Sequence, residues 1–396
     1  MALSPHQLPA LYGLGYGEDN ATLDNFNWSY DFTPDRRSPE AETLISVVLW
    51  LICLVTVVGN VLVVSAFVRD RELRLKPANV FILNLSFSDL LVGLISVSFY
   101  NVWRHTTDWT MGEALCKLWN IVDFTATTQS AMAIVLISFD RLMLVSTGLK
   151  YRKFITLRLT LLLIGASWVW SFSLNSIPIL CSDVIIEPWV DYSLDCDFAI
   201  LYRFGYKLTH TILSFVLPFV CLAIFNVIVY NNIRARSRGF HRTHSGPEGG
   251  AAARNNSQSR ATSEYRKHRK AAITLALIVG VFLTCWMPWY VYKLIGLIAL
   301  NQTPSNALTD ALAYLLWANS AINPFLYAVT HPRIRAGLVA CLLCCVPRTC
   351  RQKALRAGSR SSAGSHQTHR GQRNRPVTTM EQTECSHVCA NQLSKV

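Results

Sequence analysis

The chain has 396 residues, of which 51% are hydrophobic and only 15% are charged, a balance too apolar for an ordinary soluble protein. The apolar residues form long runs, as expected of membrane-spanning helices. The net charge of +13 does not indicate nucleic-acid binding, because Lys and Arg gather in alternate loops between the runs, as in cytoplasmic loops.

Residues 1–43 are polar and predict a flexible N-terminal segment. It carries two glycosylation sequons, at Asn20 and Asn27. Because it lacks a basic start followed by an apolar core, we expect no cleavable signal peptide, and the first span would serve as the membrane signal.

Seven apolar runs predict an all-α membrane protein, a seven-transmembrane helix bundle over residues 44–331. The spans cover residues 44–68, 78–100, 116–142, 159–180, 204–231, 271–298 and 307–329. The segment 234–264 is rich in Arg, Ser, Gly and Ala and predicts a flexible loop. Pro332 opens a short amphipathic eighth helix over 332–345, and 346–396 reads as a disordered tail.

The distribution of charge predicts the orientation of the bundle. Basic segments follow spans one, three, five and seven, whereas acidic segments precede span one and separate spans four and five. The positive-inside rule then places the N-terminus outside the cell and the C-terminus in the cytoplasm, and we expect a multi-pass protein of the plasma membrane.

The third span carries charges near both of its ends. Asp123 and Arg141 are 18 residues apart, so they share one helix face about 27 Å apart, and Ser130 lies on that face too. An ionisable residue inside a span is a functional-site hypothesis, because its desolvation is costly. The alternative is a polar group paired with a neighbouring helix. We favour the functional interpretation, since no other span offers an obvious Lys or Arg at that depth.

Short motifs occur in every span in the same order and spacing as in one known family. They are Gly59-Asn60, Leu85 to Asp89, Asp140-Arg141-Leu142, Trp168, Pro218, Cys285 to Pro288, and Asn323 to Tyr327. Over residues 44–345 the chain therefore resembles a rhodopsin-like (class A) G-protein-coupled receptor. The tail would then meet arrestin and receptor kinases, and lipids would surround the bundle.

The acid in span three marks the aminergic branch of that family, where a carboxylate at this position pairs with a ligand ammonium. Such a charge-assisted bond is strong where water is scarce, and aromatic faces add cation–π attraction. The resemblance implies a ligand site formed by Asp123, Phe124, Thr127, His210, Thr211, Ser214, Trp286, Trp289, Tyr290 and Trp317. The alternative for the aromatic residues is simple lining of the bundle or an interfacial belt; Tyr314 is left open between the two.

Finer features resemble histamine receptors of the subgroup coupled to inhibitory G proteins. These are the run LLWANSAINPFLY with Trp317, VLISFDR in span three, and Phe225-Asn226 with Tyr230. One position departs, because that subgroup has Glu where this chain has Ser214. With His210 and Thr211, Ser214 could bond a hydroxyl, a phenol, an indole N–H or an imidazole. An octopamine, tyramine, trace-amine or muscarinic-type receptor is therefore the alternative, and His210 could equally be structural.

The resemblance also implies how a signal would cross the bundle. Coupling to the G protein would involve Asp140, Arg141, Trp286, Pro288, Asn323, Pro324 and Tyr327, with Pro288 as a hinge and Arg141 as the contact. Many relatives place an acid opposite Arg141 at the start of span six, where this chain has His268. We therefore expect signalling in the absence of ligand.

Three further sites follow from the resemblance. An allosteric sodium ion would bind to Asp89, Ser130, Asn319 and Asn323, with Ser320 as a further oxygen ligand; the alternative is a water-filled polar network. Cys116 and Cys196 would form a disulfide, while Cys181 is left undecided. Palmitoylation is expected at Cys344 and Cys345, beside Cys341, against the alternative of packing on lipid.

Other classes fit less well. A retinal-binding opsin needs a Lys seven residues before Pro324, where this chain has Trp317. A transporter would show an internal repeat, which we do not find. We expect no enzyme activity, since no nucleophile–base set or HExxH motif appears, and no cofactor beyond the sodium ion.

Overall fold

The computed structural model describes residues 38–106, 109–185, 203–243, 251–298 and 306–342, together with residues 192, 196, 198 and 200. The predicted first half of the bundle comprises α2 (Pro39–Arg69), α4 (Pro77–Leu91) with η1 (Val92–Val97) and α5 (Ser98–Thr106), α6 (Gly112–Thr147) and α8 (Leu157–Ile185). The second half comprises α9 (Phe204–Thr211) with η4 (Ile212–Val216) and α10 (Leu217–Thr243), α11 (Ala251–Ile298) and α12 (Asn306–Thr330). Short helices connect or follow them: α3 (Arg71–Arg74), η2 (Gly148–Lys150), α7 (Tyr151–Phe154) and α13 (Pro332–Leu342).

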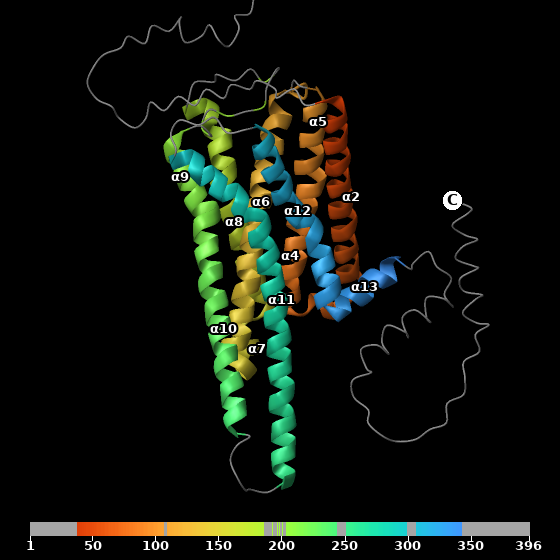
Figure 1. Ribbon diagram of the computed structural model, residues 1–396, viewed down its shortest axis with the longest axis vertical. Helices are drawn as coiled ribbons and strands as arrows, with labels where there is room; N and C mark the ends of the chain where they lie inside the picture. Colours follow the sequence, from red (N-terminus) through yellow and green to blue (C-terminus); the bar gives the residue numbers. More distant parts are fainter. Residues whose placement is uncertain are drawn as a thin grey trace, which may run out of the picture.

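The long helices pack side by side in one bundle (Figure 1). The helix α13 lies across the lower end of the bundle against α2, and α10 and α11 project below it. We call the upper end, which holds Cys116 and Cys196, the disulfide end, and the lower end, which holds Asp140 and Arg141, the Asp140 end. The described residues are helical or irregular and contain no strand, so the predicted all-α bundle is confirmed.

Membrane spanning accounts for the composition of the helices. Six helical segments among the described residues are long and apolar enough to cross a bilayer, and they match the first six predicted spans. The seventh, α12, has 25 residues, a length of about 37 Å that also suffices. It is less apolar because it carries buried Asn319, Ser320 and Asn323. Large apolar side chains such as Leu162 and Val184 are exposed on the outside of the bundle, as expected where lipid covers the surface.

Local sequence explains where α2 begins. The side chain of Ser38 accepts a hydrogen bond from the Ala41 amide at 3.3 Å, and Pro39 occupies the first helical position. A Ser cap and an N1 proline are both favoured there. Glu40 and Glu42 lie in the first turn, where carboxylates interact favourably with the helix dipole.

Two π-helical segments interrupt the spans and turn serines inward. Pro218 has no N–H for the Ser214 carbonyl, which removes one α-helical bond next to η4. In η1, a Cβ on Gly93 would lie 3.0 Å from carbon atoms of α2, so the glycine permits close packing there. Ser96 of η1 and Ser214 of η4 are both buried. Segments of this kind are often found at functional sites.

Three boundaries differ from the sequence-based expectation. The helices α10 and α11 extend into 234–264, the segment predicted to be a flexible loop, and leave only 244–250 outside the description. Residues 251–270 are rich in Ala, Arg and Lys, which favour helix, and extending an existing helix avoids the cost of nucleation. The helix α8 continues through Pro178 and past residue 180, where the fourth span was expected to end, to Ile185. The helix α13 begins at Pro332 as predicted.

The close contacts of α2 depend on glycines. A Cβ on Gly59 would lie 2.8 Å from Cγ of Pro324 in α12, and a Cβ on Gly337 of α13 would lie 2.5 Å from Cβ of Ala66. Asn60 donates to the Ser320 carbonyl at 3.2 Å in the same region. The N-terminal span therefore holds α12 and α13 in place near the Asp140 end.

Candidate functional site

Asp123 lies inside the bundle between α6 and α12. Its side chain is half-buried and accepts a hydrogen bond from Nε1 of Trp317 at 3.3 Å. The buried hydroxyls of Ser96 and Thr127 lie beside the carboxylate, within reach of a hydrogen bond to it. We call these four residues the Asp123 site. It offers a carboxylate surrounded by one indole N–H and two hydroxyl groups that can donate hydrogen bonds to it.

The charge of Asp123 is not neutralised by an ion pair. Among the described residues, no cationic side chain lies within salt-bridge distance of it. The ammonium of Lys293, in α11, is nevertheless near enough for the two charges to interact. Lys293 is not an ion-pair partner of Asp123, so the expectation that no other span offers a Lys or Arg partner at that depth agrees with the described residues.

His210 has a structural bond across the bundle. Its Nε2 lies 2.9 Å from Oδ1 of Asn175 in α8. The Asn175 amide group donates to Thr128 at 3.1 Å and to the Ser171 carbonyl at 2.7 Å. The amide nitrogen of Asn175 donates to these two groups, so its oxygen accepts a hydrogen bond from His210. Nε2 of His210 therefore carries the proton. This is the structural role that the sequence left open for His210, and it links α8 to α9.

Ser214 and Tyr290 form a neutral hydroxyl pair on the opposite wall. The Ser214 hydroxyl donates a hydrogen bond to the His210 carbonyl at 2.6 Å and lies 3.5 Å from the Tyr290 hydroxyl. The ring of Tyr290 stacks on Phe215 with centroids 4.0 Å apart and on Trp286 at 5.8 Å. Thr211 is buried beside them. This wall can present hydroxyl groups and flat aromatic faces to a ligand.

The remaining predicted aromatic residues occupy different depths. Trp286 and Trp317 are almost fully buried, while Trp289 and Phe124 are half-buried. The ring of Phe124 meets His210 edge to face. Tyr314, which the sequence left undecided, lies nearer the disulfide end, where it receives a hydrogen bond from Arg104.

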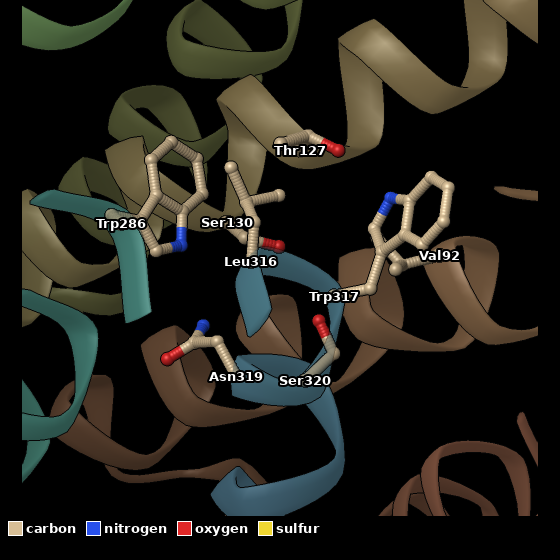
Figure 2. A pocket seen from close by; sticks show the side chains of 8 residues that line it. All are labelled: Val92, Thr127, Ser130, Trp286, Leu316, Trp317, Asn319 and Ser320. Atoms are coloured by element: carbon tan, nitrogen blue, oxygen red, sulfur yellow. The ribbon is translucent and has the colours of Figure 1, made fainter. Parts of the chain in front are cut away.

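A narrow pocket, too tight to hold a water molecule, lies next to the Asp123 site. Figure 2 shows Trp286 and Trp317 on its two sides, with Asn319 and Ser320 of α12 along its lower edge. Its lining includes Thr127 from the Asp123 site as well as residues of the polar cluster below. The two sites that the sequence predicted separately are therefore adjacent.

That polar cluster surrounds Asp89, which is fully buried. Its carboxylate accepts bonds from Ser320 at 2.8 Å, from Ser130 at 3.3 Å and from the amide nitrogen of Asn323 at 2.8 Å. We call these four residues, with Asn319, the Asp89 site. The amide oxygen of Asn319 is buried there without a hydrogen-bond partner. In the described part of the chain, no cationic side chain pairs with Asp89.

The third charged site lies at the end of α6. Asp140 accepts a hydrogen bond from the Tyr151 hydroxyl of α7, and Nε of Arg141 lies 3.5 Å from its other oxygen. Burial and the nearby Asp140 raise the pKa of Tyr151, so the phenol stays a donor. Tyr327 is fully buried, and its hydroxyl has no partner in the described structure. Burial and Arg141 lower the pKa of His331 to about 4, which leaves that ring neutral near pH 7.

Comparison with known proteins shows to which family the chain belongs. The family described as "7 transmembrane receptor (rhodopsin family)" matches residues 59–327. The chain belongs to this receptor family. Its members are receptors rather than enzymes, in agreement with the sequence analysis, and they are multi-pass membrane proteins.

The relatives of the receptor are named after different amine ligands. The octopamine receptor beta-2R of Chilo suppressalis is 25% identical over 355 residues, which cover 85% of this chain and 89% of the relative. The histamine H4 receptor of Mus musculus is 29% identical over 365 residues, covering 75% and 91%. The 5-hydroxytryptamine receptor 4 of Rattus norvegicus is 27% identical over 304 residues, covering 74% of each chain.

The disulfide end of the receptor has its own small core. Cys116 and Cys196 form the predicted disulfide, whereas Cys181 is free. Buried Trp109 and Trp119 stack beside the disulfide with centroids 5.5 Å apart. Five predicted positions lie outside the described side chains: Asn20, Asn27, His268, Cys344 and Cys345.

One further charged cluster of the receptor was not identified from the sequence. Arg104 of α5 forms ion pairs with Glu42 of α2 and, at 2.8 Å, with Asp310 of α12. Tyr100 donates to Asp310 at 2.7 Å, and its ring meets Trp317 edge to face at 5.0 Å. A chain of contacts thus runs from Arg104 to the indole that bonds Asp123. The only signal in the sequence was a lone Arg close after an apolar run, the kind of residue that usually needs a partner.

Proposed function

We propose that this receptor lies in the plasma membrane, binds a biogenic amine and activates a heterotrimeric G protein. The observation that best supports the proposal is the environment of Asp123. Its carboxylate lies inside the bundle, where Trp317 donates a hydrogen bond to it, and no described cation lies within salt-bridge distance of it. An ammonium ligand would supply both the missing positive charge and hydrogen-bond donors. Relatives that are named as octopamine, histamine and 5-hydroxytryptamine receptors agree with this class.

The first candidate ligand is a histamine-like amine, on the basis of Trp317 and the other motifs in spans three, five and seven. The second is an octopamine, tyramine or trace-amine type of ligand, or a muscarinic one. The hydroxyl pair of Ser214 and Tyr290 favours this second group, because neutral hydroxyls suit a phenol or alcohol. The bond from His210 to Asn175 also makes the imidazole less available to a ligand.

We propose that ligand binding shifts the population between two packings of the bundle. A ligand on Asp123 would press on Trp286, and α11 would swing outward about Pro288. Arg141 would then leave Asp140 and contact the G protein, of the inhibitory class, while Tyr327 turns toward it. The buried, unpartnered hydroxyl of Tyr327 is consistent with a group that gains its bond in the other state. The coupling equals the difference in ligand affinity between the two packings.

We further propose that the Asp89 site binds sodium. Carboxylate, hydroxyl and amide oxygens are suitable ligands for such a hard cation. Asp89, Ser130 and Ser320 converge there, and the unpartnered oxygen of Asn319 could complete the set. Asn323 presents nitrogen to Asp89, so its amide would have to turn before it could act as a ligand. The ion would supply the counter-charge that Asp89 otherwise lacks.

Other proposals concern segments outside the description. The N-terminus would lie outside the cell, with glycans on Asn20 and Asn27, and the C-terminus in the cytoplasm. Cys344 and Cys345 would be palmitoylated beside α13, and arrestin and receptor kinases would act on the tail. These follow from the sequence alone.

The decisive experiment compares a panel of biogenic amines on the wild-type receptor and on Asp123→Asn, with cyclic AMP and calcium as readouts. A hydrogen bond between charged groups contributes about 1.5–3 kcal/mol, so we expect potency to fall by about 10- to 100-fold. Glu113→Gln is the control, because it removes an exposed carboxylate from the same helix. An amine that acts equally on the wild type and on Asp123→Asn would refute the anchor.

A second substitution separates the two candidate ligands. Ser214→Glu places a carboxylate where histamine receptors of the inhibitory subgroup have one. A gain in histamine potency would indicate a diverged histamine site. No gain for histamine, together with a loss for octopamine or tyramine, would favour the second group.

A further inference from the structure

Arg104 of α5 joins three helices at the disulfide end. Its side chain is only 12% exposed, and it forms ion pairs with Glu42 of α2 and Asp310 of α12. One nitrogen, Nη1, contacts both Asp310, at 2.8 Å, and the hydroxyl of Tyr314, which lies one helical turn further along α12. A nearly buried arginine at the end of a membrane span is costly unless it is paired. These contacts therefore fix its guanidinium group between α2 and α12.

The carboxylate of Asp310 extends this constraint to a second tyrosine. Its Oδ2 accepts a hydrogen bond from Arg104, and its Oδ1 accepts one from the hydroxyl of Tyr100 at 2.7 Å. Tyr100 and Arg104 are four residues apart and share one face of α5. Asp310 and Tyr314 share one face of α12 in the same way. The hydroxyls of both tyrosines are therefore held by one ion pair.

The rings of these two tyrosines lie against the indole of Trp317. The ring of Tyr100 meets the indole edge to face, with centroids 5.0 Å apart. The ring of Tyr314 lies at 25° to it, with centroids 6.3 Å apart. The indole N–H donates to Asp123 at 3.3 Å, near the long limit for a hydrogen bond of this type. A small displacement of the indole would therefore lose the bond.

We propose that Arg104 is a positioning residue for the amine site: through the two tyrosines it holds the indole of Trp317 in the orientation that donates to Asp123. This inference rests on the proposed amine-binding function and assigns part of it to a residue that acts through others. The donated bond fixes the carboxylate, so that it is already oriented when the ammonium arrives. An oriented anchor binds more tightly, because less conformational freedom is lost on binding.

Fluorine NMR of the full-length receptor labelled with 5-fluorotryptophan tests the positioning without a ligand. The signal of Trp317 is the one that disappears in Trp317→Phe. Arg104→Met, which keeps a long side chain but removes the charge, should shift or broaden this signal. Glu42→Gln is the matched control, because it breaks the ion pair that Arg104 makes with α2 rather than with α12. It should leave the Trp317 signal in place.

Binding of tyramine and of histamine to the purified receptor then links the indole to the anchor. Arg104→Met should lower the affinity for both amines by about two- to tenfold, as for the loss of one hydrogen bond. Tyr100→Phe removes only the hydroxyl bond to Asp310; it should act in the same direction and serves as the test if Arg104→Met does not fold. In a Trp317→Phe background, Arg104→Met should have no further effect, because both changes remove the same bond.

The outcomes distinguish this inference from the proposal beneath it. If Arg104→Met leaves the Trp317 signal in place, or lowers the affinity equally with and without the indole, the inference is overturned and the amine anchor stands. An effect of Glu42→Gln equal to that of Arg104→Met would indicate a merely structural role and would also overturn it. If Asp123→Asn leaves the binding of both amines unchanged, or neither amine binds at millimolar concentration, the proposed function fails and this inference fails with it.

Discussion

The contact of Gly59 with Pro324 provides a sharp test of how α2 packs against α12. A Cβ at position 59 would lie 2.8 Å from Cγ and 3.0 Å from Cβ of Pro324. The proline ring cannot swing aside as a flexible side chain would, so Gly59→Ala must push the helices apart. Overpacking of this kind costs about 1–3 kcal/mol, and the better helix propensity of Ala returns about 1 kcal/mol.

Gly280 of α11 is the matched control. It also lies within a long helix, but a Cβ there meets no atom within 4 Å. Gly280→Ala therefore gains the same helix propensity, about 1 kcal/mol, with no steric cost. The difference between the two variants isolates the packing cost at Gly59, about 1–3 kcal/mol.

Thermal unfolding of the purified receptor measures that difference. Cys285 is a buried free cysteine, so a thiol-reactive dye reports its exposure as the bundle unfolds. At about 2–4 °C per kcal/mol, the Tm of Gly280→Ala should exceed that of Gly59→Ala by about 2–12 °C. Equal or inverted Tm values would refute close packing of α2 against α12.

Three further predictions concern charged groups. Arg104→Met breaks two partly buried ion pairs and should lower unfolding stability by about 2–4 kcal/mol; an unchanged Tm would contradict this. Cells that express the receptor should inhibit cyclic AMP production even when no amine is present. His268→Glu, which places an acid opposite Arg141, should reduce this basal inhibition. A basal response equal to that of empty cells would rule out ligand-free signalling. The hydrogen bond and charge of Arg333 hold the pKa of Glu72 below its usual 4.5, so the attachment of α13 should persist at neutral pH and weaken only as the pH falls through that lowered pKa. Hydrogen exchange of α13 at pH 3 and pH 6 checks this, and equal protection would disprove it.

The fold was predictable because each span is an apolar run, and the charged positions stood out within those runs. Asp123 and Arg141 were found in this way, whereas Asp89 and the disulfide of Cys116 with Cys196 followed from the family resemblance. Helix ends were less accessible. A polar segment such as 251–264 contains helix-favouring Ala and Arg, but composition alone does not show that it continues a helix already formed next to it.

Contacts between helices were the least predictable part of the site. Whether Lys293 faces lipid or the pocket depends on the rotation of α11, and the bond from His210 to Asn175 depends on how α8 and α9 pack. The π segments add a local change of register, which brings Ser96 and Ser214 inward. Sequence spacing alone assumes a regular helix and misses both effects.

The length of α11 has a mechanical consequence. From Pro288 to the first residue of the helix, Ala251, there are 37 residues, or about 55 Å of continuous helix. A rotation of about 10° at the proline would displace the far end by about 10 Å, several times the movement near Trp286. A rigid arm of this length turns an ångström-scale change at the ligand into a displacement comparable to the width of a helix.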